Sequence, residues 1–279
     1  MKRELWVVAG LAALVGCAGG LPSLDDVLSP ERRELVGRLG AAAMPMSTEM
    51  EVDIGRSVAG TVVAREPILD HDELQRYVEL VGHAVAQQSP RRGELRFHFA
   101  VLDEDEVNAY AAPGGYIFIT RGALEVMESE AELAAVLAHE IAHVDAKHVV
   151  EEIRRADAFR VVQEEADLSG EVLERVTGVG SSLLFTGLSR GDEMEADSLA
   201  ILYAGATGYR PDALVHFLER LQEMEADPAR AGRLRQLGST HPDSGERVEA
   251  ARRILASSGL GGRGLLLDDR FRERVALSP

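Results

Sequence analysis

One apolar segment, interrupted by two histidines and a glutamate, constrains this chain more than any other feature. Residues 133–148 read LAAVLAHEIAHVDAKH, with His139, Glu140 and His143 set among small and aliphatic residues. The aliphatic positions predict a helix over 131–148. Histidines four positions apart lie on one face of a helix, so both imidazoles can reach the same point. Burying these groups without a partner would be costly, so the segment predicts that something binds there.

A divalent metal ion would satisfy this arrangement. Imidazole nitrogens are common zinc ligands, so the spacing predicts one Zn²⁺ per chain, held by His139 and His143. Glu140 lies about 100° round the helix from His139, which places its carboxylate beside the ion rather than on it. From there it can act as the catalytic general base toward a metal-activated water. A catalytic zinc usually has three protein ligands, so one more must come from elsewhere.

An acidic segment supplies candidates for the third ligand. Residues 189–200 read SRGDEMEADSLA, and the spacing predicts a helix over 190–206. Asp192, Glu193, Glu195 and Asp197 all carry a suitable carboxylate, and the four can equally form a solvated acidic face. Glu193 and Glu195 point about 200° apart on a helix, so only one of them can face the ion. The residues alone leave the choice among these acids open.

Four segments, in order along the chain, resemble the M48 metallopeptidases, the family of the CAAX prenyl endopeptidases and their bacterial relatives. They are VNAYAAPGGYIFITRG at 107–122, HEIAH at 139–143, EMEAD at 193–197 and STHPDSGER at 239–247. The resemblance covers roughly residues 46–257 and favours the short, lipid-anchored bacterial members, because we see neither the membrane-spanning helices nor the helical repeats of other branches. The resemblance implies a zincin-like fold and peptide-bond hydrolysis.

The resemblance also implies roles for individual residues. Glu193 corresponds to the third zinc ligand, and Asp197 to a second-shell acceptor that orients a histidine ligand. His241 would be a catalytic-site residue that lies near the metal and can fill its open position in a resting state, although a surface position beside the following proline is the alternative. Arg247 would act catalytically, by stabilising the oxyanion of the tetrahedral intermediate.

The segment at 107–122 implies the substrate-binding part of the site. Two strands joined by Pro113-Gly114-Gly115 fit the pattern, and an exposed strand edge can take a peptide as an added strand. Asn108, Ala109, Gly114 and Gly115 are therefore the candidate substrate-binding residues, and a plain hairpin turn is the alternative. His148 is nine residues from His139, so on a continuous helix it would face away from the ion and serve as a packing or hydrogen-bonding residue.

Periodicity gives the fold class as α+β: a mostly helical, zincin-like metalloprotease domain with a small sheet whose edge strand flanks the active-site helix. The patterns predict helices over 47–65, 70–88, 124–127, 131–148, 149–167, 171–186, 190–206, 211–225 and 243–257, and strands over 95–102, 107–110 and 116–120. The domain spans 46–257, and the tail at 258–279 adds a strand or covers the surface.

The N-terminus has the features of a targeting segment. Residues 1–16 have a basic start and a twelve-residue apolar stretch, too short to span a bilayer. They end in LVG before Cys17, which resembles a bacterial lipobox with Cys17 as the lipidation site; an incidental cysteine in an uncleaved anchor is the alternative. We therefore expect a lipoprotein signal peptide at 1–16, a tether at 17–45, and a lipid anchor at the periplasmic face of the outer membrane.

The net charge limits the classes of partner that this chain is expected to bind. The formal net charge of −17 disfavours nucleic acid. The sequence predicts a zinc metalloendopeptidase, a hydrolase of protein quality control that cleaves misfolded or unassembled envelope proteins. The alternatives are a lipid-anchored periplasmic chaperone or assembly factor with little proteolysis, and a metal carrier, which would need a fuller ligand set.

Overall fold

The computed structural model describes residues 46–156, 170–241 and 244–276. The predicted signal peptide, the tether and Cys17 lie outside these ranges and stay predictions. The elements are α4 (Thr48–Arg65), α5 (Asp72–Ala86), β1 (His98–Leu102), β2 (Ala109–Ala112), η2 (Pro113–Gly115), β3 (Tyr116–Thr120), α6 (Arg121–Val126), α7 (Glu130–Asp145), α8 (His148–Arg155), α10 (Gly170–Thr186), α11 (Arg190–Thr207), α12 (Ala213–Ala226), η3 (Ala231–Leu234), α13 (Arg235–Thr240), α14 (Ser244–Ser258) and α15 (Asp268–Val275). The prediction of a mostly helical α+β fold with a small sheet is confirmed.

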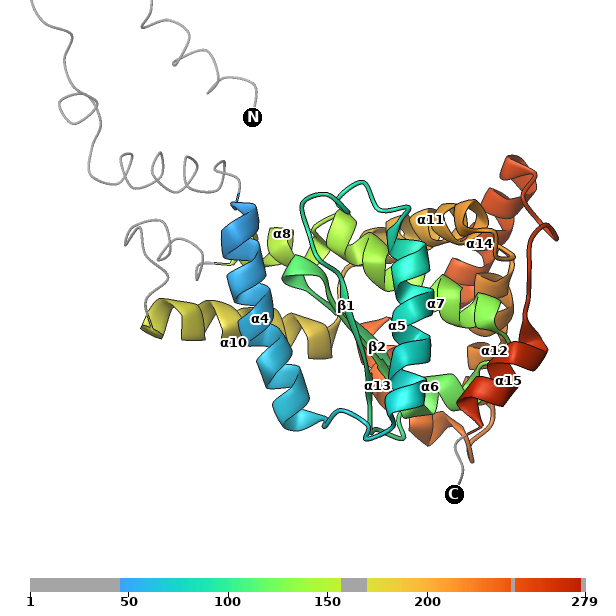
Figure 1. Cartoon of the computed structure of the whole chain (residues 1–279), viewed down its shortest axis with the longest axis horizontal. Coiled ribbons are helices and arrows are strands. Elements are labelled where there is room, and N and C mark those ends of the chain that lie inside the picture. Colours follow the sequence, from blue (N-terminus) through green and yellow to red (C-terminus); the bar gives the residue numbers. More distant parts are fainter. Residues whose placement is uncertain (1–45, 157–169, 242–243, 277–279) are drawn as a thin grey trace, which may run out of the picture. The chain divides into compact units, whose positions relative to one another are not determined.

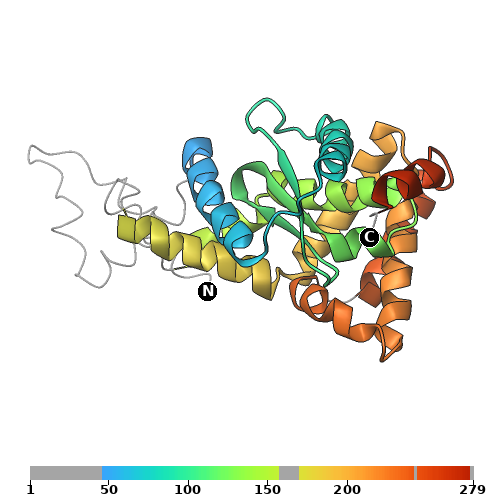
Figure 2. The same cartoon turned by 60° about the horizontal axis from the view of Figure 1, so that its bottom comes forward.

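The sheet separates two apolar cores. Its strand order is β1-β3-β2, with β1 parallel and β2 antiparallel to β3. Successive side chains of a strand point to opposite faces. In β3, Ile117 and Ile119 therefore join the larger core with α5, α7, α11 and α12, whereas Phe118 joins a smaller core with α4, α8 and α10. In Figures 1 and 2, α4 and α10 lie side by side, on the side away from α11, α12 and α14.

The turn between β2 and β3 is packed tightly against α4. A Cβ added to Gly55 of α4 would lie 1.8 Å from the carbonyl oxygen of Pro113, so only glycine allows this approach. Gly114 has φ of 74°, a conformation that glycine adopts without steric cost. The Gly114 amide donates to a carboxylate oxygen of Glu51 at 3.2 Å. These contacts hold the β2–β3 hairpin in place beside α7.

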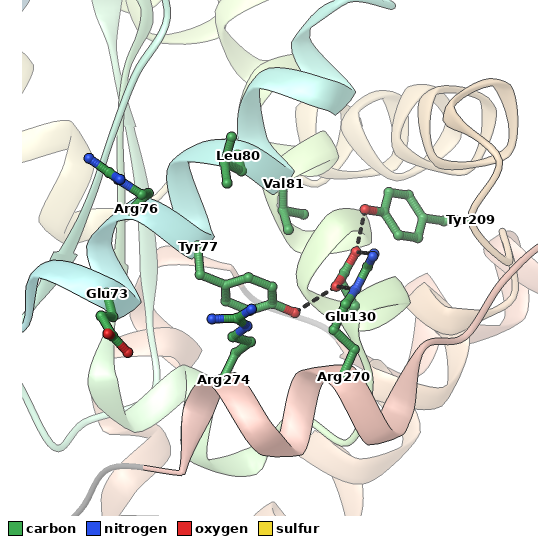
Figure 3. A pocket seen from close by; sticks show the side chains of 9 residues that line it. All are labelled: Glu73, Arg76, Tyr77, Leu80, Val81, Glu130, Tyr209, Arg270 and Arg274. Carbon is green, nitrogen blue, oxygen red and sulfur yellow. Dashed lines mark hydrogen bonds and ion pairs between the residues drawn. The ribbon is translucent and has the colours of Figure 1, made fainter.

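The first turn of α7 is fixed by a buried polar network. Ser129 caps the helix by accepting from the amide of Glu132, and the carboxylate of Glu130 follows inside the first turn, where the helix dipole favours it. Tyr77 and Tyr209 donate their hydroxyls to Glu130 at 2.8 and 2.6 Å, and Arg270 of α15 forms a two-nitrogen ion pair with it. Figure 3 shows both tyrosines pointing at Glu130 from opposite sides. The network ties α5, α15 and the segment that follows α11 to the start of α7.

Two elements differ from the sequence predictions. The tail is predicted to add a strand or to cover the surface; residues 268–275 instead form a helix, and Phe271 is buried in the larger core. The predicted continuous helix at 131–148 is wrong, because α7 ends at Asp145 and α8 begins at His148. Lys147 between them has φ of 60°, which is unusual for a residue with a Cβ and breaks the helical run. Of the predicted helix at 149–167, residues 157–169 lie outside the described ranges.

No helix of the described ranges has both the length and the apolar character that crossing a bilayer would require.

Candidate metal centre

Helix α7 places two imidazoles side by side in the interior, with their rings nearly perpendicular at 83°. It is buried from Glu130 to Val144, so His139 and His143 are almost inaccessible to solvent. Their Nε2 atoms lie 2.9 Å apart. The spacing of four residues accounts for this, since it stacks side chains one turn apart.

Helix α11 supplies a carboxylate to the same point. Ser189 and Asp192 form a reciprocal capping box that fixes the start of the helix. In the first turn, buried Glu193 has its oxygens 3.5 Å from His139 Nε2 and 3.4 Å from His143 Nε2. The competing Glu195 is 62% exposed on the other side of α11.

His241 completes a group of four. It follows α13, and its Nδ1 lies 3.0 Å from a Glu193 oxygen. One ligand atom from each of His139, His143, Glu193 and His241 lies within 4.8 Å of the others. Two ligand atoms bound to one tetrahedral zinc ion at about 2.1 Å lie roughly 3.4 Å apart. The distances of 3.5 and 3.4 Å from the Glu193 oxygens to the two Nε2 atoms match this spacing, and the two Nε2 atoms lie closer, at 2.9 Å. The donor set of imidazoles and one carboxylate also fits this ion.

Burial and mutual charge perturb these groups strongly. Burial, together with the charge of the nearby His139, lowers the pKa of His143 to about 3, so His143 presents a neutral ring. Burial alone would lower the pKa of His139, but the carboxylates of Asp197 and Glu193 raise it to about 9. Burial opposes ionisation of Glu193, yet His241 and the other two histidines hold its pKa well below its usual range. The site is thus arranged to keep a negative carboxylate among imidazoles.

Glu140 lies beside the group, as predicted from its position on the helix. It is buried, and its carboxylate is 3.9 Å from Nε2 of His241. Burial raises the pKa of Glu140, partly offset by the charge of His241 and His139. A carboxylate with a raised pKa is a better proton acceptor near neutral pH than an exposed one.

Asp197 and Arg247 lie behind the group and hold it. Asp197 Oδ1 is 2.9 Å from Nδ1 of His139, although the two are not aligned for an ideal hydrogen bond. Arg247 donates to both oxygens of Asp197 at 2.8 Å and lies 3.0 Å from Glu193. All three guanidinium nitrogens therefore face these carboxylates. This geometry gives Arg247 a holding role, and its predicted role toward an oxyanion stays a prediction.

The predicted substrate-binding residues divide into two groups. Ala109 lines two narrow pockets, which share Glu140 and His241 and lie on either side of the metal cluster. Asn108 lines one of them, and its side-chain oxygen accepts from Thr240 at 3.1 Å. Gly114 and Gly115 line neither pocket and lie in the turn against α4. Their part in binding substrate remains a prediction, while their positive φ angles explain why glycines stand there.

Both pockets are mainly apolar. The pocket beside Asn108, which we call the α12 pocket, is walled by Leu214, Phe217, Leu218 and Leu221 together with Leu237. The other, which we call the α10 pocket, lies beside Tyr110 and is walled by Val149, Leu183, Leu184 and Leu188. Sequence analysis missed these residues, because only the packing of α10 and α12 against α7 and β2 places them near the histidines.

The sequence also predicts the wrong position for His148. Because the left-handed Lys147 turns the chain back, His148 does not point away from His143: the two Nδ1 atoms lie 2.8 Å apart. His148 is not in the group of four candidate ligands, as expected, but the reason is its position behind His143 rather than across the helix. Its expected hydrogen-bonding role is present.

Known proteins match this chain over the segment that carries the site. The model of peptidase family M48 matches residues 72–255. The beta-barrel assembly-enhancing protease of Yersinia pestis is 25% identical over 233 residues, or 79% of this chain and 47% of that protein. The mitochondrial metalloendopeptidase OMA1 is 33% identical over 159 residues in Schizosaccharomyces pombe (56% of this chain, 45% of that protein) and 31% over 183 residues in Arabidopsis thaliana (65% and 36%). The chain spans less than half the length of each of these relatives.

Proposed function

Because the chain belongs to peptidase family M48, we propose that it is a zinc-dependent endopeptidase that hydrolyses peptide bonds in misfolded or unassembled envelope proteins. The observation that carries the proposal is the convergence of His139, His143 and Glu193 on one point, with the buried carboxylate of Glu140 beside it. This is three protein ligands plus a base, the composition of a catalytic rather than a structural zinc site.

The residues assigned to the ion are His139, His143 and Glu193, with His241 occupying the fourth position at rest. When bound, zinc supplies Lewis acidity toward a peptide carbonyl and lowers the pKa of water. Glu140 takes the proton from the attacking water and returns it to the leaving nitrogen. Asp197 and Arg247 keep His139 and Glu193 in place, and we keep the predicted role of Arg247 toward the oxyanion as part of the proposal. For a peptide to bind, His241 must give up its position, since it borders both pockets.

The surroundings of the site favour an unfolded chain as substrate. Strand β2 is at the edge of the sheet, and Ala109 of this strand lines both the α12 pocket and the α10 pocket. Its four residues are buried rather than exposed, so a peptide reaches this edge only after the groove opens. A peptide added along that edge places apolar side chains in these pockets. Apolar segments are buried in folded proteins and exposed in unfolded ones. The chain is therefore suited to distinguish unfolded polypeptides from native ones.

Location is proposed from the sequence and the relatives together. We assign residues 1–16 to a lipoprotein signal peptide, 17–45 to a tether and 46–257 to the catalytic domain, with Cys17 lipidated at the outer membrane. The name of the Yersinia pestis relative, which refers to β-barrel assembly, supports an envelope role.

Substitution of Glu140 by glutamine tests the activity. We expect the full chain to bind zinc and to cleave casein, and Glu140→Gln to keep its zinc but lose about 100-fold or more in cleavage rate, as general acid–base catalysis usually contributes that much. Glu223→Gln is the matched control, because Glu223 is exposed on α12.

Two results would contradict the proposal. Full activity after removal of the metal by phenanthroline would exclude a zinc mechanism. If neither the parent nor Glu140→Gln cleaves casein but both prevent an unfolded protein from aggregating, the chain is a chaperone instead.

A further inference from the structure

The ring of His143 needs a hydrogen-bond acceptor on the side away from the cluster. Its Nε2 faces His139 and Glu193, so a metal ligand at Nε2 carries its proton on Nδ1. A ligating histidine almost always donates this proton to a carboxylate, a carbonyl or water. For His139 the partner is Asp197. His143 is also buried, and its hydrogen-bond partner is of a less common kind.

That partner is another imidazole. Nδ1 of His148 lies 2.8 Å from Nδ1 of His143, and the rings are 5.0 Å apart at 70°. Both side chains are at least nine-tenths buried. Two nitrogens at this distance need one donor and one acceptor, so His148 must present an unprotonated Nδ1 if His143 donates.

The surroundings of His148 favour the tautomer that does this. Its Nε2 lies 3.6 Å from Asp192 and 3.7 Å from Glu195, both on the first turns of α11, and forms a hydrogen bond with neither, so these carboxylates act on it through their charge. Carboxylates on that side stabilise a proton on Nε2. Nδ1 of His148 is then left as the acceptor. The carboxylates thus fix the tautomer of His148, and His148 in turn fixes the tautomer of His143.

The backbone is also arranged for this contact. Lys147 adopts the left-handed conformation, which costs an ordinary residue free energy and persists only where packing requires it. The turn brings His148 back under His143 instead of letting α7 continue. From these observations, and on the basis of the proposed zinc site, we propose that His148 is a positioning residue that fixes the tautomer and orientation of the zinc ligand His143.

Zinc affinity in a set of single substitutions of the full chain tests this. His148→Leu fills similar space without an acceptor, whereas His148→Asn keeps an acceptor oxygen close to the place of Nδ1. We expect His148→Leu to weaken zinc binding roughly 10- to 100-fold in competition with a chromogenic chelator, the usual effect of losing such a partner. His148→Asn should restore most of that affinity. The ¹⁵N shifts of His143 in the zinc-loaded protein should show a proton fixed on Nδ1 in the parent and in His148→Asn.

A control separates positioning from packing. Ile153→Ala creates a cavity on the same helix, in the smaller core, and should lower Tm without changing zinc affinity. If His148→Leu binds zinc as tightly as the parent, or if His148→Asn is as weak as His148→Leu, the inference is wrong while the zinc site stands. If the parent itself binds no zinc, the proposed function fails as well.

Discussion

Replacing Glu130 by glutamine should destabilise the protein measurably, although this residue lies away from the histidines. The substitution keeps the shape and removes the charge that receives two tyrosine hydroxyls and Arg270. Hydrogen bonds to charged groups are roughly twice as strong as neutral ones, so each hydroxyl bond loses about 1 kcal/mol. The new amide donor faces other donors, which costs about 1 kcal/mol more. Arg270 is 51% exposed and contributes less than about 1 kcal/mol.

The sum is a loss of about 3 kcal/mol in the free energy of unfolding. For a domain of this size it corresponds to a decrease of roughly 6–12 °C in Tm. Urea titrations followed by circular dichroism measure it, with Glu128→Gln as an exposed control that should change by about 0.5 kcal/mol or less. Tyr209→Phe should cost about 1 kcal/mol in the parent and less in the Glu130→Gln background. If Glu130→Gln lowers the free energy of unfolding by less than about 1 kcal/mol, this network does not stabilise the start of α7 as argued.

Four further outcomes are expected. Because the pKa of His139 is raised to about 9 in the metal-free protein, zinc must displace a proton there; affinity measured by chelator competition should rise with pH up to about 9 and then level off. Casein cleavage should fall below about pH 5.5, because protons compete with zinc for imidazole and protonate Glu140, whose pKa burial raises. Leu218→Arg in the α12 pocket should lower kcat/KM for peptides with an apolar residue at the cleavage site roughly 10-fold or more, with little change for acidic ones. Gly114→Ala should lower the free energy of unfolding by about 1–3 kcal/mol in urea titrations, because its φ is positive and its Cβ would lie 2.8 Å from the Cα of Val52.

The fold class and the histidine pair could be predicted from the sequence because their signals are local. A spacing of four residues in an apolar helix places His139 beside His143 whatever surrounds it. Glu193 and His241 came from a resemblance to known motifs, since residue types alone left four acids in competition. The structure brings Glu193 into the group and leaves Glu195 exposed.

Other parts of the site depend on contacts between distant residues. The hydroxyl of Tyr209 meets Glu130 across 79 residues, and no periodicity marks such a pair. The position of His148 depends on one left-handed residue, Lys147, which carries none of the glycine or asparagine signal that usually announces this conformation. Extrapolating the helix through that residue reversed the direction in which His148 points.

The four candidate ligands are distributed from residue 139 to residue 241, on α7, on α11 and after α13. A nascent or partly unfolded copy of this chain therefore holds only the histidine pair, which gives weak metal binding and no base poised against a bound peptide. Hydrolytic competence would arise last, together with the packing of the core. Under the proposed function, a chain that is still being synthesised would therefore have no assembled site with which to cleave itself.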